Sequence, residues 1–233
     1  MAEINQDVIS ALLSKTNSKQ FIIKNTLEHF EKSKITLNNI IKEIGNQITD
    51  NQSEVIVQYK DNGKYEAQIK FGGDMLFFGM HTNVFTFDIN HPIQKFKYVQ
   101  EDGMRAYCGM IEIYNFLKDS ITYSRLNDVG YLMARIFINQ DNHFFTEGKG
   151  QFAFLYGDFE NQIFSQEIMY EMIQTVMLYS IQFDLWAPSL AEVDQLTVLE
   201  KIQQTGMIAH KTAKRVGFSM HHKSDLTKTK NNE

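Results

Sequence analysis

The spacing of apolar residues changes abruptly near residue 54, and this change limits the possible folds more than any other feature of the sequence. Over residues 1–50 the apolar residues recur every three or four positions, which is the period of a helix. Over 54–156 they alternate with polar residues in short runs, as in strands with one covered face. Helical spacing returns over 163–216. A chain that orders helices, then strands, then helices is expected to form an α+β protein.

The first 50 residues are expected to form a helical layer of separate helices. One is predicted over residues 4–13, and a second follows around 23–30. The third is the clearest, with Thr36 as its expected N-cap. Its apolar stripe consists of Leu37, Ile40, Ile41, Ile44 and Ile48. Such stripes are typical of the core face of a helix.

The returning helical spacing predicts C-terminal helices packed on the sheet. Residues 165–183 are apolar around most of the helix circumference, which indicates a central helix on the sheet or between subunits. The capping box that begins at Ser189 predicts a further helix. Residues 217–233 have no apolar period and are expected to form a disordered basic tail. One domain is therefore expected over residues 1–216.

The segment EVIVQYKDNGKYEAQIKF, which begins at Glu54, predicts a hairpin. A three-residue loop over 61–63, with Gly63 in the left-handed conformation, gives both strands the same apolar face. The expected pairs are Tyr59 with Tyr65, Val57 with Ala67, and Val55 with Ile69.

Further strands are predicted between turn signals rich in glycine, asparagine and aspartate. They cover residues 74–79, 83–88, 95–100, 104–114, 130–138, 143–147 and 151–156. The short connections favour antiparallel pairing, because parallel strands need crossovers of about a dozen residues or more. Residues 115–129 fit a short helix as well as a strand. The expected centre of the fold is an antiparallel sheet of hairpins.

The charge of the chain is unevenly distributed. The formal net charge is −5, but residues 201–233 hold seven Lys and Arg against two acids, a net +5, which leaves −10 for the first 200 residues. The body should therefore repel nucleic acid. Only the basic C-terminus, with Lys211, Lys214 and Arg215, is a candidate for binding nucleic acid or an anionic surface.

The single cysteine and the N-terminal sequence indicate a cytoplasmic location. Cys108 has no partner for an intrachain disulfide, and a Cys-rich zinc site is also excluded. The N-terminus has no long apolar signal segment. No apolar run reaches the roughly 20 residues that a transmembrane helix needs.

The stretch TEGKGQFAFLYGDF, which begins at Thr146, contains two partial signatures. Glu147 and Lys149 have the spacing of a metal-dependent nuclease strand, in which a second acid helps to hold Mg²⁺. Asp141 and His143 are the nearest further candidates. If Ile138 lies opposite His143 in the hairpin, however, Glu147 lies opposite Ala134, where no acid is present.

The second signature is that of an RNA-binding strand. Phe152 and Phe154 would share one face of the strand predicted over 151–156, where they could stack on bases. The surrounding order of elements and the acidic body do not fit an RNA-recognition domain, and two such phenylalanines are more typical of a core.

A metal site is a third hypothesis. His81, Asp88 and His91 lie close together in sequence and could form a two-histidine, one-carboxylate site for iron or zinc, with His143 added from another turn. Their spacing matches no fixed ligand template. Metal binding is therefore not expected, and neither is any cofactor.

The common nucleotide-binding and hydrolase motifs are absent from the sequence. We therefore expect a soluble intracellular binding or scaffolding protein without catalytic activity. With 18 Phe, 10 Tyr and 11 Met, it is expected to associate with itself or another protein through an aromatic and Met-rich surface. The alternative is a metal-dependent phosphodiester hydrolase that uses Glu147 and Lys149 with nearby Asp and His residues.

Overall fold

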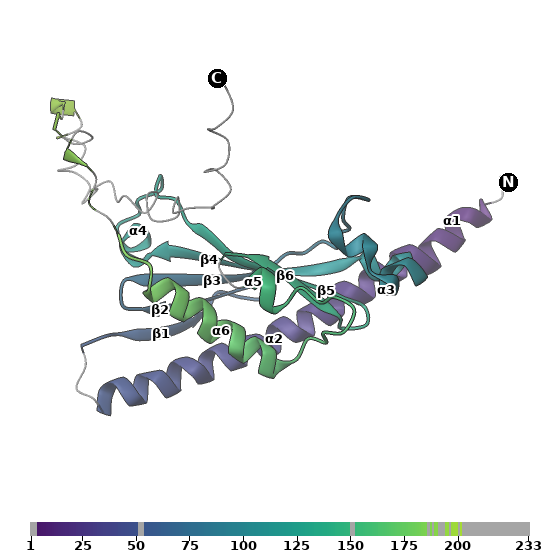
Figure 1. Ribbon diagram of the computed structural model, residues 1–233, viewed down its shortest axis with the longest axis horizontal. Coiled ribbons are helices and arrows are strands. Elements are labelled where there is room, and N and C mark those ends of the chain that lie inside the picture. Colours follow the sequence, from purple (N-terminus) through teal and green to yellow (C-terminus); the bar gives the residue numbers. More distant parts are fainter. Residues whose placement is uncertain are drawn as a thin grey trace, which may run out of the picture.

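The computed structural model describes residues 4–50, 54–149 and 152–185, together with isolated positions between 187 and 201. These residues form a six-stranded antiparallel sheet with a long helix before it and a shorter helix after it (Figure 1). The expected α+β class is confirmed. Within this described part, no helix is both long and apolar enough to cross a membrane.

The N-terminal part is one continuous helical rod instead of separate helices. α1 (Gln6–Ala11) passes through a π-helical turn, η1 (Leu12–Thr16), into α2 (Asn17–Asp50). Neither proline nor glycine occurs between residues 4 and 44, so nothing in the backbone ends the helix at the expected boundaries. The prediction of Thr36 as an N-cap is therefore wrong. Thr36 lies inside α2, and its hydroxyl donates to a carbonyl one turn back.

The six strands follow the order of the chain, and each pairs with the next in antiparallel orientation. They are β1 (Val57–Asp61), β2 (Glu66–Phe71), β3 (Asp74–Met80), β4 (Cys108–Leu117), β5 (Tyr131–Asn139) and β6 (Phe144–Gly148). The short helices between and after them are η2 (Pro92–Lys95), α3 (Lys97–Glu101), η3 (Gly103–Ala106), α4 (Lys118–Thr122) and α5 (Phe152–Leu155).

One face of the sheet is covered by α2 and by α6 (Gln166–Ile181), which run side by side (Figure 1). Ser165 is the N-cap of α6, and its hydroxyl oxygen accepts the backbone N–H of Ile168; the helix buries apolar residues against α2 and the sheet. The expected central helix is therefore present. α2 approaches β4 closely at Gly109, where a Cβ atom would lie 2.1 Å from Oγ1 of Thr26.

The opposite face of the sheet is covered at one end by the segment between β3 and β4. A second apolar cluster forms there, and its buried members are Ile93, Val99, Ala106, Cys108, Met110, Phe137, Phe145 and Phe159. The remainder of this face carries half-buried side chains, among them Phe77, Tyr114 and Phe116. Because side chains alternate along a strand, this face holds the residues between those that contact α2 and α6.

The first hairpin has the expected three-residue loop, but it lies two residues further along. Tyr59 pairs with Ile69 and Val57 with Phe71, so the predicted register is wrong. Gly63 still has a positive φ of 108°. Lys34 of α2 explains the position of the loop, since its ammonium group donates to the carbonyl of Gly63 and lies 3.3 Å from Oδ1 of Asp61. The shift is even, so the same residues face the core.

Three predicted strands are not strands in the structure. Residues 83–88 make only an isolated bridge at Phe85, and 95–100 lie in η2 and α3. The aromatic residues of this segment pack over the second cluster, and their spacing imitates the alternation of a strand. Residues 152–155 of the strand predicted over 151–156 form α5, so the sheet ends at Gly148 and not at 156.

The ambiguous segment contains both of the elements that its sequence allowed. β4 continues to Leu117 and α4 follows it directly. β4 itself starts at Cys108, because the first residues of the strand predicted over 104–114 belong to η3. The helix predicted from Ser189 and the tail predicted over 217–233 lie largely or wholly outside the described residues.

Candidate functional site

The register of the hairpin between β5 and β6 decides which side chains surround Glu147. Ile138 pairs with Phe144, and Glu147 therefore lies opposite Arg135 and not opposite Ala134. The predicted register is wrong by one residue, and a one-residue slip moves every side chain of the strand to the other face. The loop that Ile138 and its partner enclose is one residue longer than expected, since it spans 139–143, and Asn142 within it adopts a φ of 63°.

Glu147 is held by two cationic or polar groups of its own chain. Its Oε2 forms an ion pair with the guanidinium group of Arg135. Its Oε1 lies 3.2 Å from Nε2 of His91. Nδ1 of His91 accepts the backbone N–H of Ile93, which leaves the proton on Nε2 and makes that nitrogen the donor to Glu147. Both carboxylate oxygens are thus engaged.

His91 is brought to Glu147 by the segment that covers the second apolar cluster. It precedes η2, and its ring packs at 4.7 Å from the ring of Phe87. The side chains of His91, Glu147 and Arg135 are 24%, 33% and 41% exposed. The three groups therefore form a half-buried ion-pair network on the sheet face opposite α2 and α6.

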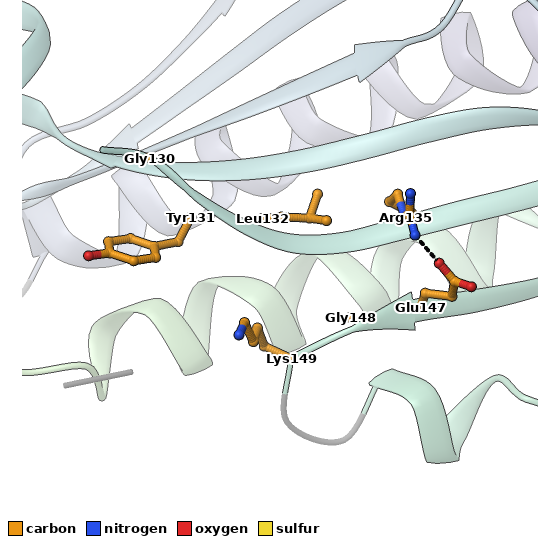
Figure 2. Close-up of a pocket in the computed structure, with 7 residues that line it drawn as sticks. All are labelled: Gly130, Tyr131, Leu132, Arg135, Glu147, Gly148 and Lys149. Carbon is orange, nitrogen blue, oxygen red and sulfur yellow. Dashed lines mark hydrogen bonds and ion pairs between the residues drawn. The ribbon is translucent and has the colours of Figure 1, made fainter. Parts of the chain in front are cut away.

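A shallow hollow of about 480 Å³ lies beside this network (Figure 2). It is lined by Gly130, Tyr131, Leu132, Arg135, Glu147, Gly148 and Lys149. Figure 2 shows Arg135 and Glu147 directed toward one another across β5 and β6, with Lys149 just beyond the end of β6. The two strands approach closely here, since a Cβ atom on Gly148 would lie 2.4 Å from the carbonyl oxygen of Met133.

The residues proposed for a nuclease site do not gather in one place. Glu147 and Lys149 both line the hollow, but Asp141 and His143 lie at the other end of β6. Oδ2 of Asp141 accepts the hydroxyl of Tyr98 at 2.8 Å. The ring of His143 stacks on Tyr98 at 4.3 Å. Among the described residues Glu147 is the only acid that lines the hollow, so the residues placed there do not fit the paired carboxylates that Mg²⁺ requires.

The proposed metal ligands each have a separate partner. Nδ1 of His81 accepts the backbone N–H of Asn83 at 3.1 Å. Asp88 accepts the backbone N–H of Asn90, and this hydrogen bond lowers the pKa of the Asp88 carboxyl. His91 is bonded to Glu147. Over the described ranges 4–50, 54–149 and 152–185, no group of three His, Cys, Asp or Glu side chains is placed to hold a metal ion.

The proposed RNA-binding residues are not on a strand. Phe152 is buried in the main core at 1% exposure, and Phe154 belongs to the same helix, α5. Phe152 therefore cannot offer its ring to a base. The other binding candidates, Lys211, Lys214 and Arg215, lie outside the described residues.

A second polar network, which sequence reasoning missed, fixes the turn between β5 and β6. Asn139 is fully buried, and its amide donates to the hydroxyl of Tyr98 and the carbonyl of Arg105. Its carbonyl oxygen accepts the backbone N–H groups of Asp141 and His143. Burial, followed by Asp141, raises the pKa of Tyr98 far above its usual range. The network connects the turn with the segment that carries His91.

Arg135 is the functional candidate that the sequence could have revealed. It is the only charged residue in the strand YLMARIFIN, at a position where alternation places it away from the core. The partnership of His91 with Glu147 had no comparable signal. Comparison of the chain with protein families, curated proteins and solved structures found no match.

Proposed function

We propose that this chain is a non-catalytic binding or scaffolding protein that associates with itself. The observation that carries the proposal is a set of large apolar side chains left exposed on the N-terminal part of the rod. They are Ile4, which directly precedes the rod, and Val8, Ile9, Leu12 and Leu13 of α1 and η1, with exposed fractions between 37% and 72%. Contiguous apolar surface of this kind is typical of an interaction site.

The place of these residues supports the proposal. α1 and η1 bury no residue at all, whereas Ile22 of α2 is fully buried. In Figure 1, α1 extends past α3 and beyond the end of the sheet. The rod therefore keeps its apolar character for several turns after it has left the core. An isolated helix end of this length gains little stability in water unless another surface covers it.

The charged groups of the candidate site support a function without catalysis. Catalytic groups converge on a point where a substrate can meet them, whereas Arg135 and His91 occupy both oxygens of Glu147. The alternative, a metal-dependent phosphodiester hydrolase, gains no support from the hollow, because its described lining contributes a single carboxylate.

The residues that we assign to self-association differ from the expected ones. Most methionines of the described part lie in the core, namely Met75, Met80, Met110, Met133, Met169, Met172 and Met177. A Met-rich surface is therefore not available there. The exposed aliphatic residues of α1 and η1 take its place in the proposal.

Sedimentation velocity over a range of protein concentrations tests this function. We expect the wild-type mass to rise from monomer to dimer with concentration, and Leu12→Glu to remain monomeric. Ile35→Glu is the matched control, because Ile35 is 63% exposed on the same rod but lies outside the apolar set. A wild-type chain that stays monomeric at all concentrations contradicts the proposal.

A further inference from the structure

The tip of the first hairpin carries a reactive pair of residues. Asn62-Gly63 is the one place in the sequence where glycine follows asparagine. Glycine has no Cβ atom to shield its backbone nitrogen, so this nitrogen can approach the side-chain amide of the residue before it. Gly63 is exposed, and a Cβ atom there would meet nothing within 4 Å, so water reaches the tip. We propose that Asn62 is a site of deamidation and that the folded hairpin restrains the reaction.

The reaction is a cyclisation followed by a hydrolysis. The backbone nitrogen of Gly63 loses its proton to water or hydroxide and attacks Cγ of Asn62. A bond forms between these two atoms, the bond from Cγ to Nδ2 breaks, and Nδ2 takes up a proton and leaves as ammonia. Water then opens the cyclic imide at one of its two carbonyl groups, which leaves aspartate or isoaspartate at position 62. The chain gains water, loses ammonia and acquires one negative charge.

Two sets of hydrogen bonds oppose the first step. The backbone N–H of Gly63 donates to Oδ1 of Asp61 at 2.9 Å. This hydrogen bond lowers the pKa of the Asp61 carboxyl, so the acceptor is ionised at neutral pH. Loss of the proton from that nitrogen would place an anion beside a carboxylate, which is unfavourable. Nδ2 of Asn62 donates to Oε1 of Glu66 and to Oε1 of Gln68, both at 2.8 Å. The amide is thereby fixed against β2 and is not free to turn toward the attacking nitrogen.

Lys34 of α2 keeps the tip closed. Its side chain is 5% exposed, and its ammonium group donates to the carbonyl of Gly63 and lies 3.3 Å from Oδ1 of Asp61. A buried ammonium group that loses such partners is strongly unfavourable, so Lys34 opposes opening of the tip. Deamidation in the native protein therefore waits for a local opening of the hairpin, and its rate follows the fraction of time that the tip is open.

Conversion makes the opening permanent. A carboxylate at position 62 has no proton to donate, so the donors to Glu66 and Gln68 are lost, and the new charge lies beside those of Asp61 and Glu66. Isoaspartate also adds one carbon to the main chain of a loop that is closed by the backbone N–H of Asn62 on the carbonyl of Glu66. Both products loosen the tip and weaken its contact with α2. Asn62 thus turns a transient opening into a lasting change.

Peptide mapping by mass spectrometry measures the reaction. The protein is held at mildly alkaline pH, either native or unfolded in guanidinium chloride, and conversion of the amide to the acid is followed in the peptide that contains Asn62. The ratio of the unfolded to the native rate reports the restraint, because the intrinsic reactivity of the sequence cancels. We expect a ratio above about tenfold for the wild type. Asn62→Gln should give no conversion in either state, because glutamine would have to close a larger ring.

Asp61→Ala tests the restraint itself. This variant removes the acceptor of the Gly63 N–H, and it should lower the ratio by about tenfold, which corresponds to one hydrogen bond to a charged group. Lys60→Ala is the matched control, because Lys60 is exposed on the same strand, and it should leave the ratio unchanged. Circular dichroism checks that both variants are folded. If Asp61→Ala retains the ratio of the wild type, the assigned restraint is wrong.

The product tests the consequence in a second measurement. Asn62→Asp reproduces one product and should unfold at a Tm about 2–4 °C below that of the wild type, because it loses two donated hydrogen bonds. An unchanged Tm would overturn the loosening of the tip. Conversion of the native protein at the unfolded rate would overturn the restraint, and no conversion even in the unfolded chain would overturn Asn62 as the site.

Discussion

Gly109→Ala is the substitution whose effect the structure defines most closely. The new methyl group would lie 2.1 Å from Oγ1, 2.8 Å from Cβ and 2.9 Å from Cγ2 of Thr26. Comfortable non-bonded contact needs about 3.5 Å. Thr26 is fully buried in α2, and its hydroxyl donates to the carbonyl of Ile22, so it has little freedom to move.

The magnitude follows from two opposing terms. Overpacking of a buried site costs about 1–3 kcal/mol. Replacing glycine by alanine in a strand returns roughly 0.5–1 kcal/mol, because the unfolded chain loses conformational freedom. We therefore expect Gly109→Ala to lower the free energy of unfolding by about 1–2 kcal/mol. For a chain of this size each kcal/mol corresponds to about 2–4 °C in Tm.

Urea unfolding followed by circular dichroism measures this loss. Gly73→Ala is the matched control, because a Cβ atom on Gly73 meets nothing within 4 Å and its backbone conformation is open to any residue. The control should change the free energy of unfolding by no more than about 0.5 kcal/mol. Thr26→Ala removes two of the three close atoms, so the double variant with Gly109→Ala should be about 1 kcal/mol more stable than the two single losses predict. If Gly109→Ala is as harmless as Gly73→Ala, or if the double variant is simply additive, the close approach of α2 to β4 is refuted.

Three further predictions concern the polar networks and the thiol. Asn139→Ala should lower the free energy of unfolding by about 2–4 kcal/mol in the same urea assay, because it leaves several buried partners without a hydrogen bond; a loss below 1 kcal/mol would show that the turn does not depend on this network. Glu147→Gln should lower the free energy of unfolding by no more than about 1 kcal/mol, since the ion pairs of Glu147 are partly solvated. Neither this variant nor the wild type should cleave DNA or RNA in the presence of Mg²⁺. Cleavage by the wild type that Glu147→Gln abolishes would restore the hydrolase hypothesis. Burial raises the pKa of the Cys108 thiol and hides the thiol from reagents. Ellman's reagent at pH 8 should therefore leave the native protein unmodified and label the protein unfolded in urea. Rapid labelling of the native protein would mean that the second cluster opens.

The sequence determines the face of each strand more firmly than the pairing register. In the hairpin of β1 and β2 each pairing partner lies four residues from the prediction, and the same residues still face the core because the shift is even. The hairpin of β5 and β6 is shifted by one residue, and Glu147 moves to the other face. The difference arises from Asn142, since asparagine tolerates a positive φ that a pattern of apolar residues cannot reveal.

The segment between β3 and β4 shows why aromatic spacing alone misleads. Phe85, Phe87 and Tyr98 have the alternation of strands, yet they pack as a cover over the second cluster. Helix periodicity was more reliable, because α6 has the expected extent within a few residues. Periodicity did not predict that the N-terminal helices join into one rod. The rod is continuous because the segment lacks glycine and proline, and the spacing of apolar residues does not report on this.

The candidate site depends on contacts that no local pattern encodes. His91 and Glu147 lie 56 residues apart in the chain, and they meet only because the covering segment is placed over β6. Arg135 could be predicted as a residue pointing away from the core, but its partner depends on the register that Asn142 sets. Prediction of the site therefore fails at the tertiary contacts and not at the choice of residue types.

Amide hydrogen exchange at two protein concentrations tests the central claim, self-association through the N-terminal end of the rod, most directly. The amides of α1 and η1 belong to a helix end without buried residues, so in the monomer they should exchange rapidly. At high concentration we predict slower exchange over residues 6–19, with no change in the amides of β3, β4 and β5. Exchange that is independent of concentration, or slowing confined to the sheet, would contradict the account.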